Sequence, residues 1–252
     1  MSLLVVQDLT KSFGGVHAVR SVDFRLERGE RLAIIGPNGA GKSTCFDMVG
    51  GQRRPDAGRV LLDGEDVTGL GPDRIWAKGV GRTFQVAASF ASMTVAENVQ
   101  MALINHHGSS RALWPLARRL YRDEALALLD RVGMAAQADR TMGVLAYGDV
   151  KRVELAIALA NEPKLLLMDE PTAGMATAER LALMDLTSRI VQEQGAALLF
   201  TEHDMDVVFR HADRILVLAR GAVVAEGPPA AIRADPEVQA IYLGQGFEGA
   251  AP

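Results

Sequence analysis

Short apolar runs alternate with helical stretches along most of the chain. Residues 19–26 alternate between apolar and polar side chains, which predicts a strand with one buried face. Three predominantly apolar runs have the length of buried strands, at residues 31–35, 164–168 and 196–201. Helices are predicted at residues 149–160 and 178–194, the second closed by Gly195. Strands and helices in this alternation predict an α/β fold whose mainly parallel sheet is covered on both faces.

The other segments are shorter and richer in turns. Strands are predicted at residues 3–6 and 79–85, and a helix is predicted from the glycine-rich run to about Val49. A hairpin is predicted at residues 58–66, and a strand pair at 214–218 and 222–226 around Arg220-Gly221. Helical periodicity dominates residues 94–138, which we interpret as an insertion in the α/β core. Short helices are expected at residues 205–211 and within 228–243.

Composition narrows the class of protein. The 252 residues allow one large domain or two small ones, and 48% apolar residues can form a sizeable core. No apolar run reaches 18 residues and the first residues lack a basic segment, so neither a membrane span nor a signal peptide is expected. The net charge of -4 argues against a nucleic-acid partner. The single cysteine, Cys45, excludes an intrachain disulfide and is expected to be buried.

A glycine-rich run follows the strand at residues 31–35. Residues 36–43 match the pattern G-x-x-x-x-G-K-[ST] between a predicted strand and a predicted helix. Glycines at this spacing let successive backbone N–H groups face phosphate oxygens, and the helix N-terminus adds partial positive charge. Lys42 is placed to contact the β- and γ-phosphates, and the Ser43 hydroxyl to bind Mg²⁺. The run therefore predicts a nucleoside triphosphate site.

Two adjacent carboxylates end the apolar strand at residues 165–168. Asp169 and Glu170 come where open α/β sheets bind ligands, at the carboxyl end of a buried strand. Buried carboxylates are costly unless they serve a ligand. Asp169 is expected to orient Mg²⁺ through its water shell, and Glu170 to polarise an attacking water. An ordinary solvated turn is the alternative to this interpretation.

Three further motifs say little when each is taken alone. Gln85 at the end of a predicted strand would be a surface glutamine, and His203, just past the strand at 196–201, would be structural. Residues 145–149, Leu-Ala-Tyr-Gly-Asp, would be a flexible helix start. Their order along the chain is more informative than any one of them.

Taken in order, these motifs resemble the ATP-binding subunit of ABC transporters over residues 3–243. The resemblance implies a P-loop NTPase core with an antiparallel β subdomain and an inserted helical subdomain. It assigns the Walker A loop to residues 36–44, the Q-loop to Gln85, the signature motif to 145–149, Walker B to 165–170, the D-loop to 173–175 and the switch histidine to His203. A single domain is implied over residues 1–252, with core segments at about 1–85 and 145–243, a helical subdomain at about 86–144 and a tail at 244–252.

The resemblance also implies the ligand contacts. ATP is bound by the aromatic side chain of Phe13, which stacks on adenine, and by the Walker A residues Gly36, Pro37, Asn38, Gly39, Ala40, Gly41, Lys42, Ser43 and Thr44. A second subunit contributes its signature residues in trans, namely Ala146, Tyr147, Gly148 and Asp149. Mg²⁺ is arranged by Ser43, Gln85 and Asp169. The catalytic residues are Glu170 as general base, His203 and Gln85.

The signature motif departs from the common pattern Leu-Ser-Gly-Gly-Gln. Ala146 and Tyr147 resemble the branched-chain amino acid uptake branch of the family, whereas Asp149 departs even from that branch. Because Ala146 has no hydroxyl, the contact with the γ-phosphate must come from backbone N–H groups at the helix start. Asp149 has two interpretations, an exposed helix-capping residue or a carboxylate that repels triphosphate.

Function and partners follow from the same resemblance. It implies an ATPase on the cytoplasmic face of the cell membrane that energises uptake of branched-chain or related hydrophobic amino acids. The implied partners are a second ATPase subunit, two integral membrane permease subunits and, indirectly, an extracytoplasmic solute-binding protein. Two further segments resemble this branch, around Trp114 and at residues 242–244.

Other classes of function stay open. The principal alternative is the ATPase of another ABC system, such as a urea, amide or carboxylate importer or an exporter. An ABC ATPase acting on DNA or ribosomes is disfavoured by the single cassette and the net charge of -4. A small-molecule kinase or a GTPase would leave the signature motif and His203 unexplained.

Overall fold

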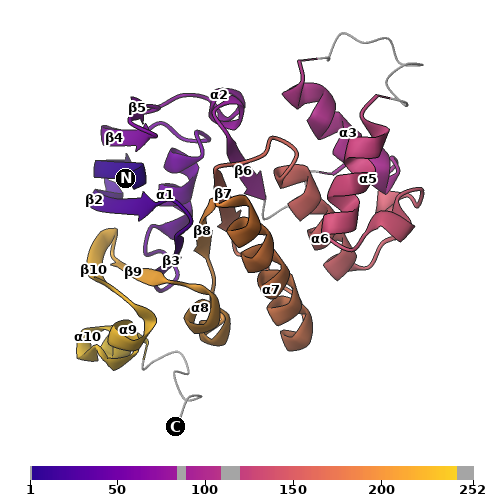
Figure 1. Ribbon diagram of the computed structural model, residues 1–252. Coiled ribbons are helices and arrows are strands. Elements are labelled where there is room, and N and C mark those ends of the chain that lie inside the picture. Colours follow the sequence, from indigo (N-terminus) through magenta and orange to yellow (C-terminus); the bar gives the residue numbers. More distant parts are fainter. Residues whose placement is uncertain (1, 84–88, 109–119, 243–252) are drawn as a thin grey trace. The chain divides into compact units, whose positions relative to one another are not determined.

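The computed structural model describes residues 2–83, 89–108 and 120–242 (Figure 1). The chain folds into two compact units. The first joins residues 1–75 to residues 197–252, and the second comprises residues 76–196. Helix α2 (Pro72–Ala77) contains the first of these divisions. The finer division into a core and a helical subdomain at 86–144 stays a prediction.

The first unit contains an antiparallel sheet in the order β2-β1-β4-β5. Its strands are β1 (Ser2–Phe13), β2 (Val16–Glu27), β4 (Ala57–Leu62) and β5 (Glu65–Asp66). Leu4 lies opposite Leu26 on one side and Leu62 on the other, and all three side chains are buried. The period-two pattern therefore predicted the buried face of this sheet.

The same unit contains four strands in the order β10-β9-β3-β8. They are β3 (Arg31–Ile35), β8 (Ala197–Thr201), β9 (Arg214–Ala219) and β10 (Ala222–Gly227). β3 pairs in parallel with both β8 and β9, while β10 pairs antiparallel with β9. Strands buried on both faces have continuous apolar sequences, and residues 32–35 are 0% exposed. Two helices accompany these strands, α1 (Lys42–Val49) and α8 (Met205–His211).

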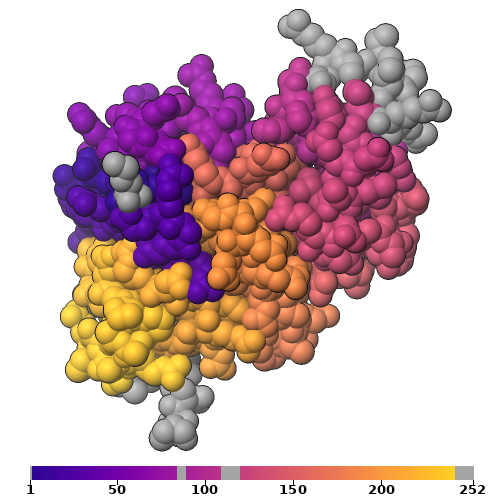
Figure 2. Space-filling model, viewed as in Figure 1, coloured from indigo at the N-terminus to yellow at the C-terminus, as the bar shows by residue number. Residues whose placement is uncertain are grey.

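The C-terminal segment differs from its prediction. The sequence indicated one short helix in residues 228–243, whereas the structure has two, α9 (Pro229–Ala234) and α10 (Pro236–Tyr242). Asp235 ends the first helix, and its carboxylate accepts hydrogen bonds from the backbone N–H groups of Glu237 and Val238 at 2.8 and 3.1 Å. The break therefore comes from an aspartate cap followed by a proline. In Figure 2 the C-terminal segments, in yellow, lie against the N-terminal strands, in indigo.

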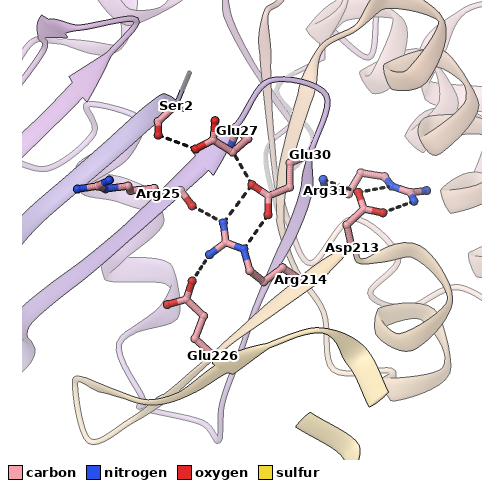
Figure 3. Close-up of polar contacts among 8 residues, drawn as sticks. All are labelled: Ser2, Arg25, Glu27, Glu30, Arg31, Asp213, Arg214 and Glu226. Atoms are coloured by element: carbon pink, nitrogen blue, oxygen red, sulfur yellow. Dashed lines mark hydrogen bonds and ion pairs between the residues drawn. The ribbon is translucent and has the colours of Figure 1, made fainter. Parts of the chain in front are cut away.

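A group of charged residues joins strands from both ends of the chain within the first unit (Figure 3). The guanidinium of Arg214 donates to both carboxylate oxygens of Glu30 at 2.7 and 3.0 Å. It also donates to the backbone oxygen of Arg25 at 2.6 Å and to the carboxylate of Glu226. We call Arg214, Glu30, Glu226 and the Arg25 carbonyl the Arg214 cluster. It ties β9 to β2, to β10 and to the residue before β3.

The second unit combines a parallel strand pair with helices. β6 (Val80–Thr83) and β7 (Leu165–Asp169) are parallel, with Val80 opposite Leu165. The helices are α3 (Val95–His106), α5 (Arg122–Arg131), α6 (Tyr147–Ala158) and α7 (Thr177–Gln194). Thr94 and Glu97 form a capping box at the start of α3, which fixes where this helix begins. Gly195 adopts the left-handed conformation at the end of α7, as the sequence predicted.

No helix in the described part of the chain is long and apolar enough to cross a membrane. Three sequence interpretations lie wholly or mainly outside the described residues. They concern Gln85, the segment around Trp114 and residues 243–244.

Candidate nucleotide-binding site

The glycine-rich loop lies in the first unit between β3 and α1. Its backbone passes so close to neighbouring strands that two positions accept only glycine. A Cβ atom at Gly36 would lie 2.2 Å from the carbonyl oxygen of Leu218, and one at Gly41 would lie 2.3 Å from that of Ala18. Gly41 also has a φ of 103°, in the left-handed region. The pattern of glycines is therefore a packing requirement as well as a phosphate motif.

Lys42 is the first residue of α1, and its side chain turns back over the loop. Lys42 is 6% exposed, and its ammonium donates to the carbonyl oxygens of Gly36 at 2.7 Å and Pro37 at 3.2 Å. A second contact within the loop joins the Ala40 N–H to the Pro37 oxygen at 3.1 Å. The loop therefore curls around a cation, and a concave backbone around a cation is a site that fits phosphate.

The start of α1 adds to this positive character. Its cap residue is Gly41, which has no side chain to accept from the N–H groups of the first turn. Ser43 follows on the exposed side, so its hydroxyl is accessible, while Thr44 is half-buried. Cys45 is fully buried, and burial raises the pKa of its thiol to about 12. This cysteine therefore packs as a small apolar side chain.

Phe13 ends β1 and is 40% exposed. Two cations lie over its ring, with Lys11 Nζ at 5.7 Å and Arg53 Cζ at 4.9 Å from the ring centroid. Lys11 is itself bound by the carboxylate of Asp56 at 2.5 Å. The ring is thus held by charged neighbours while much of its area faces solvent, as an aromatic that stacks on a planar ligand requires.

His203 also lies in the first unit, in the short loop between β8 and α8. Its side chain is exposed, whereas Thr201 and Glu202 before it are buried. The next residue, Asp204, caps α8 by accepting from the N–H groups of Asp206 at 3.0 Å and Val207 at 3.3 Å. A buried strand end on one side and a helix cap on the other fix the backbone that presents this histidine.

The paired carboxylates lie in the second unit. Asp169 is the last residue of β7 and is 6% exposed. Glu170 leaves the strand with a φ of 50°, a left-handed conformation that costs an L-residue about 1–2 kcal/mol. Strain of this kind collects at functional sites, where it fixes the direction of a side chain. The sequence indicated a site at this strand end, but nothing in it indicated the conformation of Glu170.

The signature motif begins α6 in the second unit. The helix begins at Tyr147, two residues earlier than predicted, and its cap is Ala146, which has no side-chain oxygen. Asp149 therefore lies in the first turn, so the interpretation of this residue as the helix cap is wrong. An acidic residue in the first turn still interacts favourably with the helix dipole.

The signature motif lies beside the D-loop within the second unit. A Cβ at Gly174 would lie 3.7 Å from the Tyr147 ring, and one at Gly148 would lie 3.6 Å from the end of the Met175 side chain. Lys151 Nζ lies 5.4 Å from the centroid of the Tyr147 ring, and it forms a buried ion pair with Glu154 at 3.0 Å. Each motif was predicted separately, and their proximity was not predicted.

Comparisons with known proteins decide the family. Residues 19–173 match the ABC transporter family, more than half of the chain. The chain belongs to the ABC transporter family. Residues 222–248 also match the family described as branched-chain amino acid ATP-binding cassette transporter.

Individual relatives of this cassette agree. It is 38% identical over 250 residues to the high-affinity branched-chain amino acid transport ATP-binding protein BraF of Pseudomonas aeruginosa, covering 96% of this chain and 98% of BraF. Among solved structures, a nucleotide-free ATP-binding cassette from an ABC transporter superposes with a TM-score of 0.88 at 30% identity, covering 97% of this chain and all of the other. A dimeric cassette in a post-hydrolysis state with ADP and Pi bound has a TM-score of 0.75 at 27% identity, covering 90% and 98%. The predicted fold class and family are thereby confirmed.

Proposed function

We propose that this cassette is the ATP-hydrolysing subunit of an importer for branched-chain or related hydrophobic amino acids. The glycine-rich loop that curls around the Lys42 ammonium carries the nucleotide part of the proposal. The match of residues 222–248 to the branched-chain family, together with the relative BraF, supports the class of solute. Fold alone would not support it, because one fold serves many solutes.

The first unit supplies the residues that hold the nucleotide. Lys42 and the N–H groups of the loop at residues 36–44 bind the β- and γ-phosphates, and Phe13 stacks on the adenine ring. Base stacking on an aromatic side chain contributes about 1–3 kcal/mol. The exposed Ser43 hydroxyl would help to hold Mg²⁺, and the family resemblance assigns the same role to Gln85 and Asp169 of the second unit. When bound, Mg²⁺ neutralises charge that develops on the phosphate oxygens.

The second unit supplies the proposed general base, Glu170. In the hydrolytic step a water oxygen bonds to the γ-phosphorus while the bond to the bridging oxygen of the β-phosphate breaks. The proton of that water passes to the Glu170 carboxylate, and ADP and inorganic phosphate leave. His203 and Gln85 contribute to orienting the water and stabilising the γ-phosphate. A positioned base contributes roughly 10²–10⁴-fold to such a rate.

Transport also requires a second cassette and membrane subunits. The signature residues at 146–149 contact the nucleotide of a partner cassette, so that ATP lies between two subunits. The solved dimer of a related cassette supports this pairing. Closure of the pair acts on two integral membrane permease subunits through the helical subdomain at 86–144, on the cytoplasmic face of the membrane. An extracytoplasmic binding protein selects the solute.

The solute and partners are tested together by purification from native membranes. The full chain carrying an affinity tag is solubilised with its neighbours, and the co-purifying subunits are identified by mass spectrometry. We expect two integral membrane proteins and, in reconstituted vesicles, uptake of leucine that depends on ATP. Uptake of urea, an amide or a carboxylate but not leucine would assign the cassette to another importer. Export or co-purification with ribosomes would overturn the proposal.

A further inference from the structure

The hairpin turn between β9 and β10 contacts the glycine-rich loop directly. The backbone N–H of Gly221 donates to the carbonyl oxygen of Ala40 at 3.0 Å. The carbonyl oxygen of the same residue accepts from the N–H of Arg20 at 2.7 Å. One residue therefore connects the loop to strand β2. All three residues belong to the first unit.

This position has no space for a side chain. Gly221 is buried, and its φ of 82° lies in the left-handed region. A Cβ there would lie 2.9 Å from the carbonyl oxygen of Ala18, 3.1 Å from its carbonyl carbon and 3.2 Å from the carbonyl oxygen of His17. These are backbone atoms of β2, which cannot move aside as the end of a flexible side chain can.

The carbonyl group of Ala18 also lies beside the next residue of the loop, Gly41. Its oxygen is the atom that would lie 2.3 Å from a Cβ at Gly41. The turn therefore bonds the loop at Ala40, and β2 lies close against the loop at Gly41. A displacement of Gly221 would reach both contacts.

We propose that Gly221 is a positioning residue for the phosphate loop. It fixes the Ala40 carbonyl, and with it the direction of the loop N–H groups that face the phosphates. Misplacing a group by about 1 Å can lower a reaction rate ~100-fold, and we expect displaced N–H groups to weaken phosphate binding on a comparable scale. A support of this kind therefore sets nucleotide affinity without touching nucleotide. The inference rests on the proposed function, in which residues 36–44 bind ATP.

The chain offers a matched control in the turn between β4 and β5. Both turns have two residues with positive φ, Arg220 and Gly221 at 51° and 82°, and Asp63 and Gly64 at 56° and 81°. This is the geometry of a type I′ hairpin turn. A Cβ at Gly64 would meet no atom of the described residues within 4 Å. Alanine therefore introduces the same backbone strain at both sites, but a collision only at Gly221.

The test compares Gly221→Ala with Gly64→Ala in the full chain. Binding of a fluorescent ATP analogue gives the Kd, and thermal unfolding gives the cost in stability. We expect Gly221→Ala to lose more thermal stability than Gly64→Ala, because only Gly221→Ala adds a collision to the shared backbone strain. The Kd is expected to rise roughly 10–100-fold for Gly221→Ala only. Gly221→Asn is expected to resemble Gly221→Ala, because asparagine tolerates positive φ but still carries a Cβ. An unchanged Kd in a folded Gly221→Ala protein would overturn the proposal.

Hydrogen–deuterium exchange on the wild-type protein provides a measurement that needs no variant. Because the Gly221 N–H is bonded to Ala40, ATP binding is expected to slow its exchange along with that of residues 36–43. The Asp63–Gly64 turn is expected to exchange at an unchanged rate. Slowing in the loop without slowing at Gly221 would refute the inference and leave the proposed function standing. If ATP slows neither segment and no binding is measured, the proposed function itself fails.

Discussion

Replacing Arg214 with methionine removes the cation of the Arg214 cluster and keeps an unbranched side chain. The guanidinium makes four hydrogen bonds, two to Glu30, one to Glu226 and one to the Arg25 carbonyl. Hydrogen bonds to Glu30 raise the pKa of Arg214, against the opposing effect of burial, so the cation is stabilised in the folded protein. The substitution leaves Glu30, whose side chain is 15% exposed, without this partner.

The expected loss follows from the burial of the partners. Breaking a fully buried ion pair costs about 3–5 kcal/mol, whereas an exposed pair contributes about 0.2–1 kcal/mol. The side chains of Arg214 and Glu226 are 24% and 36% exposed, which places the cluster between these limits. We therefore expect Arg214→Met to destabilise the folded state by about 2–3 kcal/mol, or by roughly 4–12 °C in Tm for a chain of this size.

Thermal unfolding followed by circular dichroism measures this effect, with Arg28→Met as the control. Arg28 pairs with Asp63, but their side chains are 52% and 39% exposed, so its loss should change Tm by no more than about 4 °C. Arg214→Lys should recover only part of the stability, because an ammonium cannot reach all these acceptors in one plane. An Arg214→Met protein as stable as the Arg28→Met protein would refute the argument from burial.

Three further predictions concern single residues. Burial acts to raise the pKa of Asp213, but hydrogen bonds from the side chain and backbone of Arg31 outweigh it and lower that pKa. The Asp213 carboxylate therefore stabilises the folded protein above the pKa of about 4 that it has in the unfolded chain, and this stabilisation is lost as the pH falls through the lower pKa of the folded protein. The difference in Tm between wild type and Asp213→Asn should accordingly shrink on acidification below about pH 4. A difference independent of pH would contradict this assignment. Cys45, with a pKa of about 12, should resist iodoacetamide at pH 8 until the protein is unfolded, and alkylation of the folded protein would show that it is accessible. Asp149→Gln should cost about 0.5 kcal/mol of stability through the lost dipole interaction. A severalfold faster ATPase rate in this variant would support repulsion of triphosphate, and an unchanged rate would rule that repulsion out.

Local sequence signals predicted most of the regular elements. The residues of β3 and α8 were predicted with their observed ends, because an apolar run with flanking turn residues bounds the strand and Asp204 caps the helix. Where local signals compete, the bounds moved. α6 begins at Tyr147, two residues before the predicted start. The prediction missed this start because the first two residues of the helix are a tyrosine and a glycine, which are weak indicators of a helix start.

Contacts between distant segments could not be predicted. Arg214 and Glu30 are 184 residues apart, and nothing near either residue indicates the other. The contact of Gly221 with Ala40 was unpredictable for the same reason, because the sequence predicted the turn but not which segment the turn contacts. The glycine-rich loop was predictable as a site because its chemistry is local, since one short segment supplies the N–H groups, the cation and the hydroxyl.

Phosphate release by the Glu170→Gln variant tests the central claim most directly. The variant keeps the shape of the side chain but removes the base, so the account predicts that it binds ATP with wild-type affinity and hydrolyses it at least about 100-fold more slowly. The wild-type cassette under the same conditions must release phosphate from ATP steadily. A Glu170→Gln protein that releases phosphate at the wild-type rate would contradict the account.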